Sequence, residues 1–151
     1  MERSSLVFAA TIISMLPGVV VAQGRNNGPQ QAEQIRLWAG ISVPQPIFGG
    51  GGVQKLQISF GVVNDGTSTV NPRIGASHLS INGVEPNDWR IVINNGLRTP
   101  EFEALPPGHF LSFSYMLGDR YFAKTGVYTV RWWGKNFRAE PITFRVLPGK
   151  R

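Results

Sequence analysis

The chain contains no cysteine and only two histidines. Without cysteine it forms no disulfide and has neither a thiolate nucleophile nor the sulfur ligands of a structural zinc site. His78 and His109 each lie beside a turn signal, and two histidines are too few for a tight zinc set without converging carboxylates. The sequence therefore predicts no metal site, no cofactor and no catalytic residue, and so a protein that is not an enzyme.

Acidic residues are also scarce, with nine Asp and Glu against fifteen Lys and Arg, for a net charge of +6. Paired carboxylates for glycosidic cleavage are available in Glu101 and Glu103, but alternation along a strand would turn both toward solvent. The basic residues are scattered and form no run of five. We therefore expect no binding of nucleic acid, whereas attraction to an anionic surface fits the charge.

The one long apolar run covers residues 6–21, and Pro17 and Gly18 interrupt it. A membrane anchor is the rival interpretation, but a membrane span needs roughly 20 uninterrupted apolar residues. Arg3 before the run and Ala22 after it are typical of an export signal. We expect residues 1–22 to be a signal peptide, and the remaining chain to be secreted or periplasmic with no membrane span. The lack of disulfides favours a bacterial source.

Residues 23–34 are polar and non-periodic, which predicts a flexible leader. Residues 35–148 form the expected domain. Alternating apolar residues and turn signals predict strands at 35–43, 56–63, 69–74, 78–81, 89–93, 110–117, 127–133 and 142–147. No sustained helical period is present, although a single turn near 119–123 fits the pattern. Asn82-Gly83 indicates a two-residue hairpin turn.

The segment at 126–130 is the most specific signal, because its Gly-x-Tyr-x-Val pattern is typical of one strand of an immunoglobulin-type sandwich. Gly126 allows the turn, the hydroxyl of Tyr128 reaches back to the corner backbone, and Val130 fills the core where antibody domains carry a cysteine. The sequence predicts an all-β fold, an immunoglobulin-like antiparallel β-sandwich of about seven to nine strands.

Four segments in the same order extend this resemblance: VVNDG at 62–66, LPPG at 105–108, FLSFSY at 110–115 and TGVYTV at 125–130. They resemble two groups of bacterial immunoglobulin-like domains. One is the intracellular proteinase inhibitor family, which is subtilisin-inhibitor-like, and the other comprises exported adhesion and binding modules. The export signal, the Trp132-Trp133 pair and the basic turn at 135–138 depart from the inhibitor family. No inhibitory residue is therefore carried over.

Adjacent residues on a strand point to opposite faces, so Trp132 and Trp133 cannot both lie in the core. If Trp132 faces inward, Trp133 faces outward beside Arg131 and Lys135. There it stacks on a sugar ring, contacts a partner's side chain, or is covered by a neighbouring loop or an arginine stem. These three residues are the candidate binding site. Trp38 and Trp89 carry the same ambiguity.

The principal hypothesis is an exported, non-enzymatic binding or structural module for an unknown protein or envelope polymer. One alternative is a proteinase inhibitor that uses an exposed loop at 43–52 or 94–103. Another is a carbohydrate-binding module that uses Trp133. We expect a monomer, because Arg145 and the prolines around the last strand would protect an open sheet edge from pairing.

Overall fold

The structure is a computed structural model that describes residues 35–49 and 52–149. The segments expected to be the signal peptide (1–22) and the polar leader (23–34) lie outside the described residues. The strands run from Leu37 to Val146.

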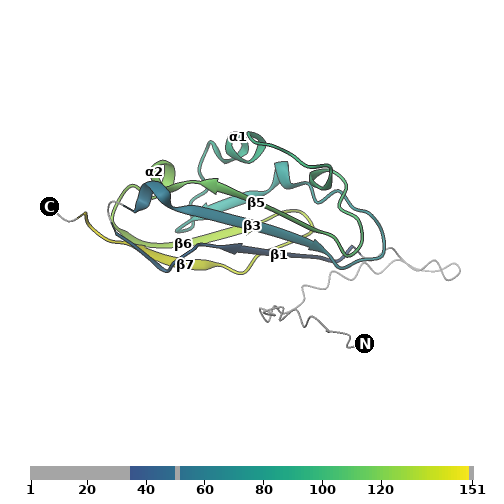
Figure 1. Cartoon of the computed structure of the whole chain (residues 1–151), viewed down its shortest axis with the longest axis horizontal. Coiled ribbons are helices and arrows are strands. Elements are labelled where there is room, and N and C mark those ends of the chain that lie inside the picture. Colours follow the sequence, from purple (N-terminus) through teal and green to yellow (C-terminus); the bar gives the residue numbers. More distant parts are fainter. Residues whose placement is uncertain (1–34, 50–51, 150–151) are drawn as a thin grey trace, which may run out of the picture. The chain divides into compact units, whose positions relative to one another are not determined.

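Two sheets form the domain (Figure 1). The first is antiparallel and has the order β1 (Leu37–Ser42), β3 (Gln57–Asn64), β5 (Phe110–Met116). The second has the order β2 (Ile47–Phe48), β7 (Ile142–Val146), β6 (Gly126–Trp133), β4 (His78–Ile81), in which only the β2–β7 pair is parallel.

The strand order is that of an immunoglobulin-like sandwich. β1, β3 and β5 take the places of strands A, B and E, and β4, β6 and β7 take those of C, F and G. Pro44 and Pro46 lie between β1 and β2, where the chain passes from the first sheet to the second. Because proline has no N–H to donate to a strand ladder, these residues end the pairing of β1. The predicted fold class is confirmed.

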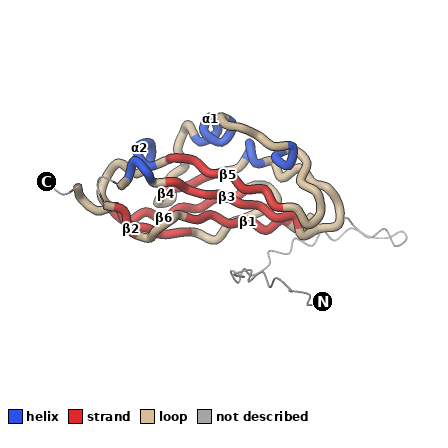
Figure 2. Tube along the Cα trace, viewed as in Figure 1, coloured by secondary structure: helices blue, strands red, loops and turns tan. Residues whose placement is uncertain are grey.

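Helical segments occupy the place of strand D. They are α1 (Trp89–Asn94) and the 3₁₀ turn η3 (Pro100–Phe102), and they lie on the β5 side of the sandwich together with α2 (Gly118–Tyr121), η1 (Val53–Lys55) and η2 (Ile74–Ala76) (Figure 2). Tyr115 of β5 ties α1 to the sheet by donating its hydroxyl to the Ile93 carbonyl oxygen at 3.2 Å.

The predicted strand at 89–93 is wrong, because this segment is helix α1. Trp89, Val92 and Ile93 are buried at the spacing of one helix face, whereas the side chain of Ile91 is exposed. The predicted strand at 69–74 is also wrong. It contains a single bridge, from Val70 to Leu105, and then enters η2. The helical turn expected near 119–123 is present as α2.

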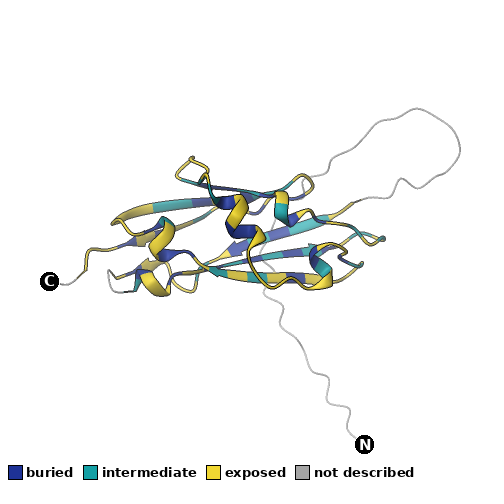
Figure 3. Ribbon diagram, turned by 90° about the horizontal axis from the view of Figure 1, so that it is seen from above, coloured by how far each residue is buried: buried dark blue, intermediate teal, exposed yellow. Residues whose placement is uncertain are grey.

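Aromatic side chains fill the core between the sheets. Trp132 of β6 is fully buried and packs edge-on against Phe60 of β3 and Phe113 of β5, with ring centroids 5.1 and 5.9 Å apart. Ser77 satisfies two buried indoles, accepting Trp132 Nε1–H on Oγ and Trp89 Nε1–H on its carbonyl oxygen, both at 3.0 Å. Buried and exposed residues alternate along the strands, as Figure 3 shows, so each sheet has a core side and an outer face.

The last strand is not a free sheet edge, contrary to the expectation from the sequence. β7 lies between β6 and β2, and Arg145 N–H donates to the carbonyl oxygen of Pro46 at 2.9 Å. The protection attributed to Arg145 therefore gives no support to a monomer.

Candidate functional site

The outer face of β4, β6 and β7 carries the residues that the sequence singled out. Val130 and Trp132 point into the core, which turns Arg131 and Trp133 outward. The strand register extends this face on both sides of β6, because residues opposite each other on paired strands share a face. We call it the cationic face and define it by His78, Arg131, Trp133, Arg138 and Arg145.

Trp133 is neither free nor buried. Its indole stacks on the imidazole of His78 in the neighbouring strand, with ring centroids 5.4 Å apart and planes within 11°. His78 Nδ1 lies 3.1 Å from Glu85 Oε2, which orients the ring. The covering group is thus a histidine of the neighbouring strand, and not the loop or arginine stem that the sequence suggested. The sequence could not reveal this pair, since nothing in it sets the register between β4 and β6.

Three arginines lie on the cationic face. Arg138 is bridged to Trp133 and Arg131 is two residues from it on β6, whereas Arg145 is opposite Val127, roughly 20 Å along the strand. Arg131, Arg138 and Arg145 are exposed, and none forms an ion pair with any described residue. Lys135 is exposed in the connection from β6 to β7, which also carries the exposed Glu140. Guanidinium groups pair in a bidentate manner with carboxylate, sulfate or phosphate groups. The chemistry available here is anion binding next to a partly exposed aromatic ring.

The start of β6 fixes the strand that presents this face. Tyr128 donates its hydroxyl to the carbonyl oxygen of Lys124 at 2.7 Å, the bond of a tyrosine corner. Gly126 has φ of 156°, a backbone conformation that L side chains rarely adopt. Val130 is fully buried two residues beyond the tyrosine. These three residues hold the corner rather than contact a ligand.

Asn82 secures β4 against β6 on the same side of the domain. Asn82 and Gly83 have φ of 50° and 84°, as a two-residue hairpin turn requires. The Asn82 side chain accepts Thr129 N–H at 2.8 Å and donates to the Val127 carbonyl oxygen at 3.2 Å. The backbone N–H of Asn82 also donates to the Thr129 carbonyl oxygen at 2.9 Å, so the side-chain amide adds to the pairing of β4 with β6 at the turn.

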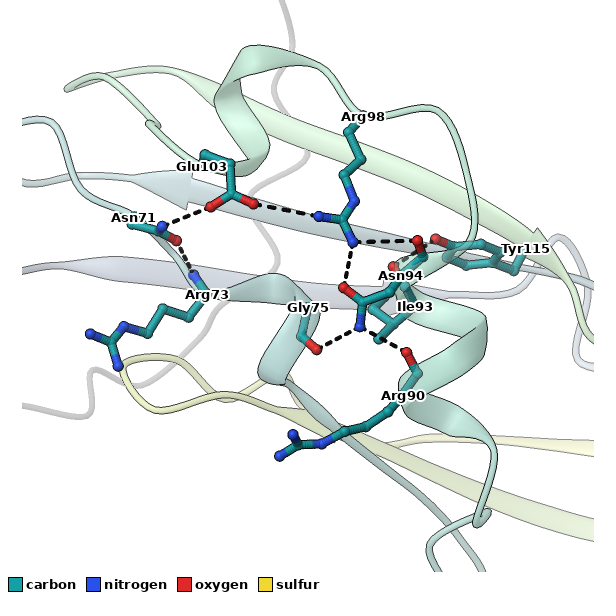
Figure 4. A network of polar contacts seen from close by, with 9 residues as sticks. All are labelled: Asn71, Arg73, Gly75, Arg90, Ile93, Asn94, Arg98, Glu103 and Tyr115. Atoms are coloured by element: carbon teal, nitrogen blue, oxygen red, sulfur yellow. Dashed lines mark hydrogen bonds and ion pairs between the residues drawn. The ribbon is translucent and has the colours of Figure 1, made fainter.

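A second polar cluster joins α1, the η3 segment, and η2 with the loop before it (Figure 4). Asn94 donates to the carbonyl oxygens of Gly75 and Arg90 at 2.9 and 2.7 Å, and Arg98 contacts both Asn94 and Glu103. Nearly every bond ends on backbone or on another member of the cluster, so its role is to tie the segments together. It also ties Asn94, Arg98 and Glu103 to the domain, while Leu97 between them is fully exposed.

The third cluster connects the start of α1 to α2. Asp88 Oδ1 accepts the Tyr121 hydroxyl at 2.8 Å, and Oδ2 accepts Arg120 Nε–H at 2.7 Å. These two hydrogen bonds, the one from Tyr121 first, hold the pKa of Asp88 below its ordinary value. Burial and the neighbouring Asp88 carboxylate raise the pKa of Tyr121.

Tyr121→Phe is therefore expected to raise the pKa of the Asp88 carboxyl group. A carboxylate with a lowered pKa in the folded state stabilises the fold above its unfolded pKa of about 3.9, and this contribution is lost as the pH falls through the folded value. The stability gap between the native chain and the variant should accordingly shrink at the lowest pH. Carbon-13 NMR titration of the Asp88 carboxyl carbon measures the shift. Tyr128→Phe is the control, because that hydroxyl bonds a backbone carbonyl, and an unmoved Asp88 pKa in Tyr121→Phe would contradict the assignment.

The described residues hold no group of three His, Asp or Glu side chains able to bind a metal ion. Glu101 and Glu103, predicted to alternate along a strand, lie instead at the 3₁₀ turn η3 and its C-terminal end. In ranges 35–49 and 52–149, no helix has the length and hydropathy needed to cross a membrane.

Comparison with known proteins does not assign the chain to a family. No family model and no curated protein matches the chain. Among solved structures, it is similar to the CARDB domain of the PF1109 protein from Pyrococcus furiosus, which was crystallised in complex with di-metal ions. The sequences are 17% identical, the match covers 79% of this chain and 98% of that one, and the TM-score is 0.46. The resemblance to the proteinase inhibitor family finds no support in these comparisons, and the immunoglobulin-like fold follows from the strand order.

Proposed function

We propose that this chain is a non-enzymatic binding module that holds an anionic polymer on the cationic face. The observation that carries the proposal is the set of three exposed arginines, Arg131, Arg138 and Arg145, without acidic partners among the described residues. Arg131 and Arg145 are presented by strands β6 and β7, which fix their positions better than a loop would, and Arg138 is bridged to Trp133 in the connection between these strands.

The polymer would carry carboxylate, sulfate or phosphate groups at intervals along a chain. The net charge of +6 attracts such a chain from a distance, and the guanidinium groups then bind its anionic groups directly. The stacked Trp133 and His78 offer an apolar ring surface to the sugar or other uncharged part of each repeat. The proposal places the domain outside the cytoplasm, in keeping with the signal peptide expected at 1–22.

Arg131→Gln is expected to weaken binding to polygalacturonate or dextran sulfate by about fivefold or more, because one charge-assisted contact is lost. Titration calorimetry at about 50 mM salt measures the affinity, which should fall further as salt is added. Uncharged dextran is not expected to occupy this face.

Lys55→Gln is the matched control, since it removes the same charge from η1, away from the cationic face. Equal losses in the two variants would show that net charge alone drives binding. That result, or an affinity unchanged in Arg131→Gln, would overturn the proposed site.

A further inference from the structure

The other sheet has an outer face of opposite character. The outward positions of β1, β3 and β5 alternate with the buried ones, and none of them is Asp, Glu, Lys, Arg or His. We call this surface the uncharged face. Its members are Trp38, Gly40, Ser42, Gln57, Ser59, Gly61, Val63, Phe110, Ser112, Ser114 and Met116.

The register arranges these residues in rows across the three strands. Trp38, Val63 and Phe110 form an apolar row. The next rows contain only glycine and serine, and the Ser59 and Ser114 hydroxyls bond each other at 2.8 Å. A flat surface of small, hydroxyl-bearing residues therefore lies beside the row that contains Trp38 and Phe110.

Phe110 contributes most of the exposed ring surface. Its side chain is 60% exposed, and the tip of its ring rests on Gly61 of β3. A Cβ atom at position 61 would lie 2.9 Å from Cε2 of that ring, so a larger residue there would displace it. The glycine thus lets an aromatic side chain lean over the sheet while remaining open to solvent.

We propose that the uncharged face is a second binding site, and that it takes a neutral polysaccharide chain. Sugar rings present C–H groups that pack on aromatic side chains, and hydroxyl groups that exchange hydrogen bonds with serine and glutamine. Neither contact needs a charge. The Arg36–Asp65 ion pair borders the face beyond Trp38, whose Nε1–H donates to Asp65 Oδ2 at 3.2 Å. In a chain of net charge +6, a face whose own positions carry no ionisable group favours a ligand that is itself uncharged.

The size of the face favours a narrow chain over a protein. Three strands of about seven residues cover roughly 350 Å², taking 4.8 Å between strands and 3.4 Å per residue. A stable protein interface buries about 800 Å² on each partner. A second copy of this chain would have to extend its contact beyond the face to reach that area, whereas a single sugar chain running across the strands fits within the face.

Retention in native gels that contain hydroxyethyl cellulose, galactomannan, xylan or dextran tests the proposal, with the intact chain run toward the cathode. We expect at least one of these neutral polymers to retard the chain, and Phe110→Ala to weaken that interaction about tenfold. Leu97→Ala is the control, because Leu97 is exposed but lies outside this face. Circular dichroism confirms that each variant is folded.

A second pair of variants keeps the test independent of Phe110. Ser112→Lys places a charge among the small residues of the face and should reduce retention, while Thr143→Lys adds the same charge to the opposite sheet and should not. The proposal is overturned if no neutral polymer retards the chain, or if retention persists in both Phe110→Ala and Ser112→Lys. It is also overturned if sedimentation shows a dimer that both variants abolish, since a second copy would then occupy the face. Arg131→Gln should leave retention intact, so this site and the cationic face succeed or fail separately.

Discussion

Gly118→Ala is expected to destabilise the domain by at least about 3 kcal/mol, because the added methyl group has no space. A Cβ atom at position 118 would lie 1.5 Å from the carbonyl oxygen of Val53 and 2.6 Å from its carbonyl carbon. Both are backbone atoms, so no side-chain rotation relieves the overlap. Helix α2 would have to move away from η1, breaking the contact between Leu117 N–H and the Leu56 carbonyl oxygen, now 3.1 Å long.

Urea unfolding followed by circular dichroism measures this effect, and the thermal midpoint should fall by roughly 10 °C or more. Gly49→Ala is the matched control, because no atom lies within 4 Å of the position its Cβ would take. That variant should remain within about 0.5 kcal/mol of the native chain. A loss below 1 kcal/mol in Gly118→Ala would mean that α2 does not pack on η1 as closely as the structure shows.

The strands that carry both outer faces were predictable from the sequence, whereas the helix between them was not. The alternation at 57–64 and 126–133 follows the buried and exposed sides of β3 and β6. A strand was predicted at 89–93 because Ile91, Val92 and Ile93 are β-branched and favour strands. The spacing of Trp89, Val92 and Ile93 does indicate a helix, because it places all three side chains on one helix face.

For the candidate sites too, one part was predictable from the sequence and another was not. The outward direction of Trp133 and Arg131 followed from the alternation of a single strand. The stack of Trp133 on His78 depends on the register between β4 and β6, which no local pattern specifies. The uncharged face depends on the pairing of three strands that are far apart in the chain. Its only sequence signal is the absence of charge at alternate positions of each strand.

Asn64 is the residue that holds the end of β3 against the rest of the domain. It is fully buried, and its Nδ2 group donates to the carbonyl oxygens of Ser68 and Leu105, both at 2.8 Å. Its Oδ1 atom accepts Gly66 N–H at 2.9 Å. A single side chain thus closes the turn after β3 and joins it to the segment before β5.

Asn64→Asp is expected to cost about 3 to 5 kcal/mol at neutral pH, although the two side chains have nearly the same shape. The substitution sets a carboxylate oxygen against two carbonyl oxygens in a site without water contact, where both repulsion and lost hydration oppose the charge. The pKa of the new carboxyl group should therefore be raised in the folded state. The group then remains protonated to a higher pH than in the unfolded chain, so the variant loses stability as the pH rises above about 4. Urea unfolding between pH 4 and 8 measures this dependence, and Asn136→Asp, at an exposed position, should show almost none of it. A pH-independent loss in Asn64→Asp would mean that the carboxylate reaches solvent, and that the turn after β3 opens more easily than its three hydrogen bonds imply.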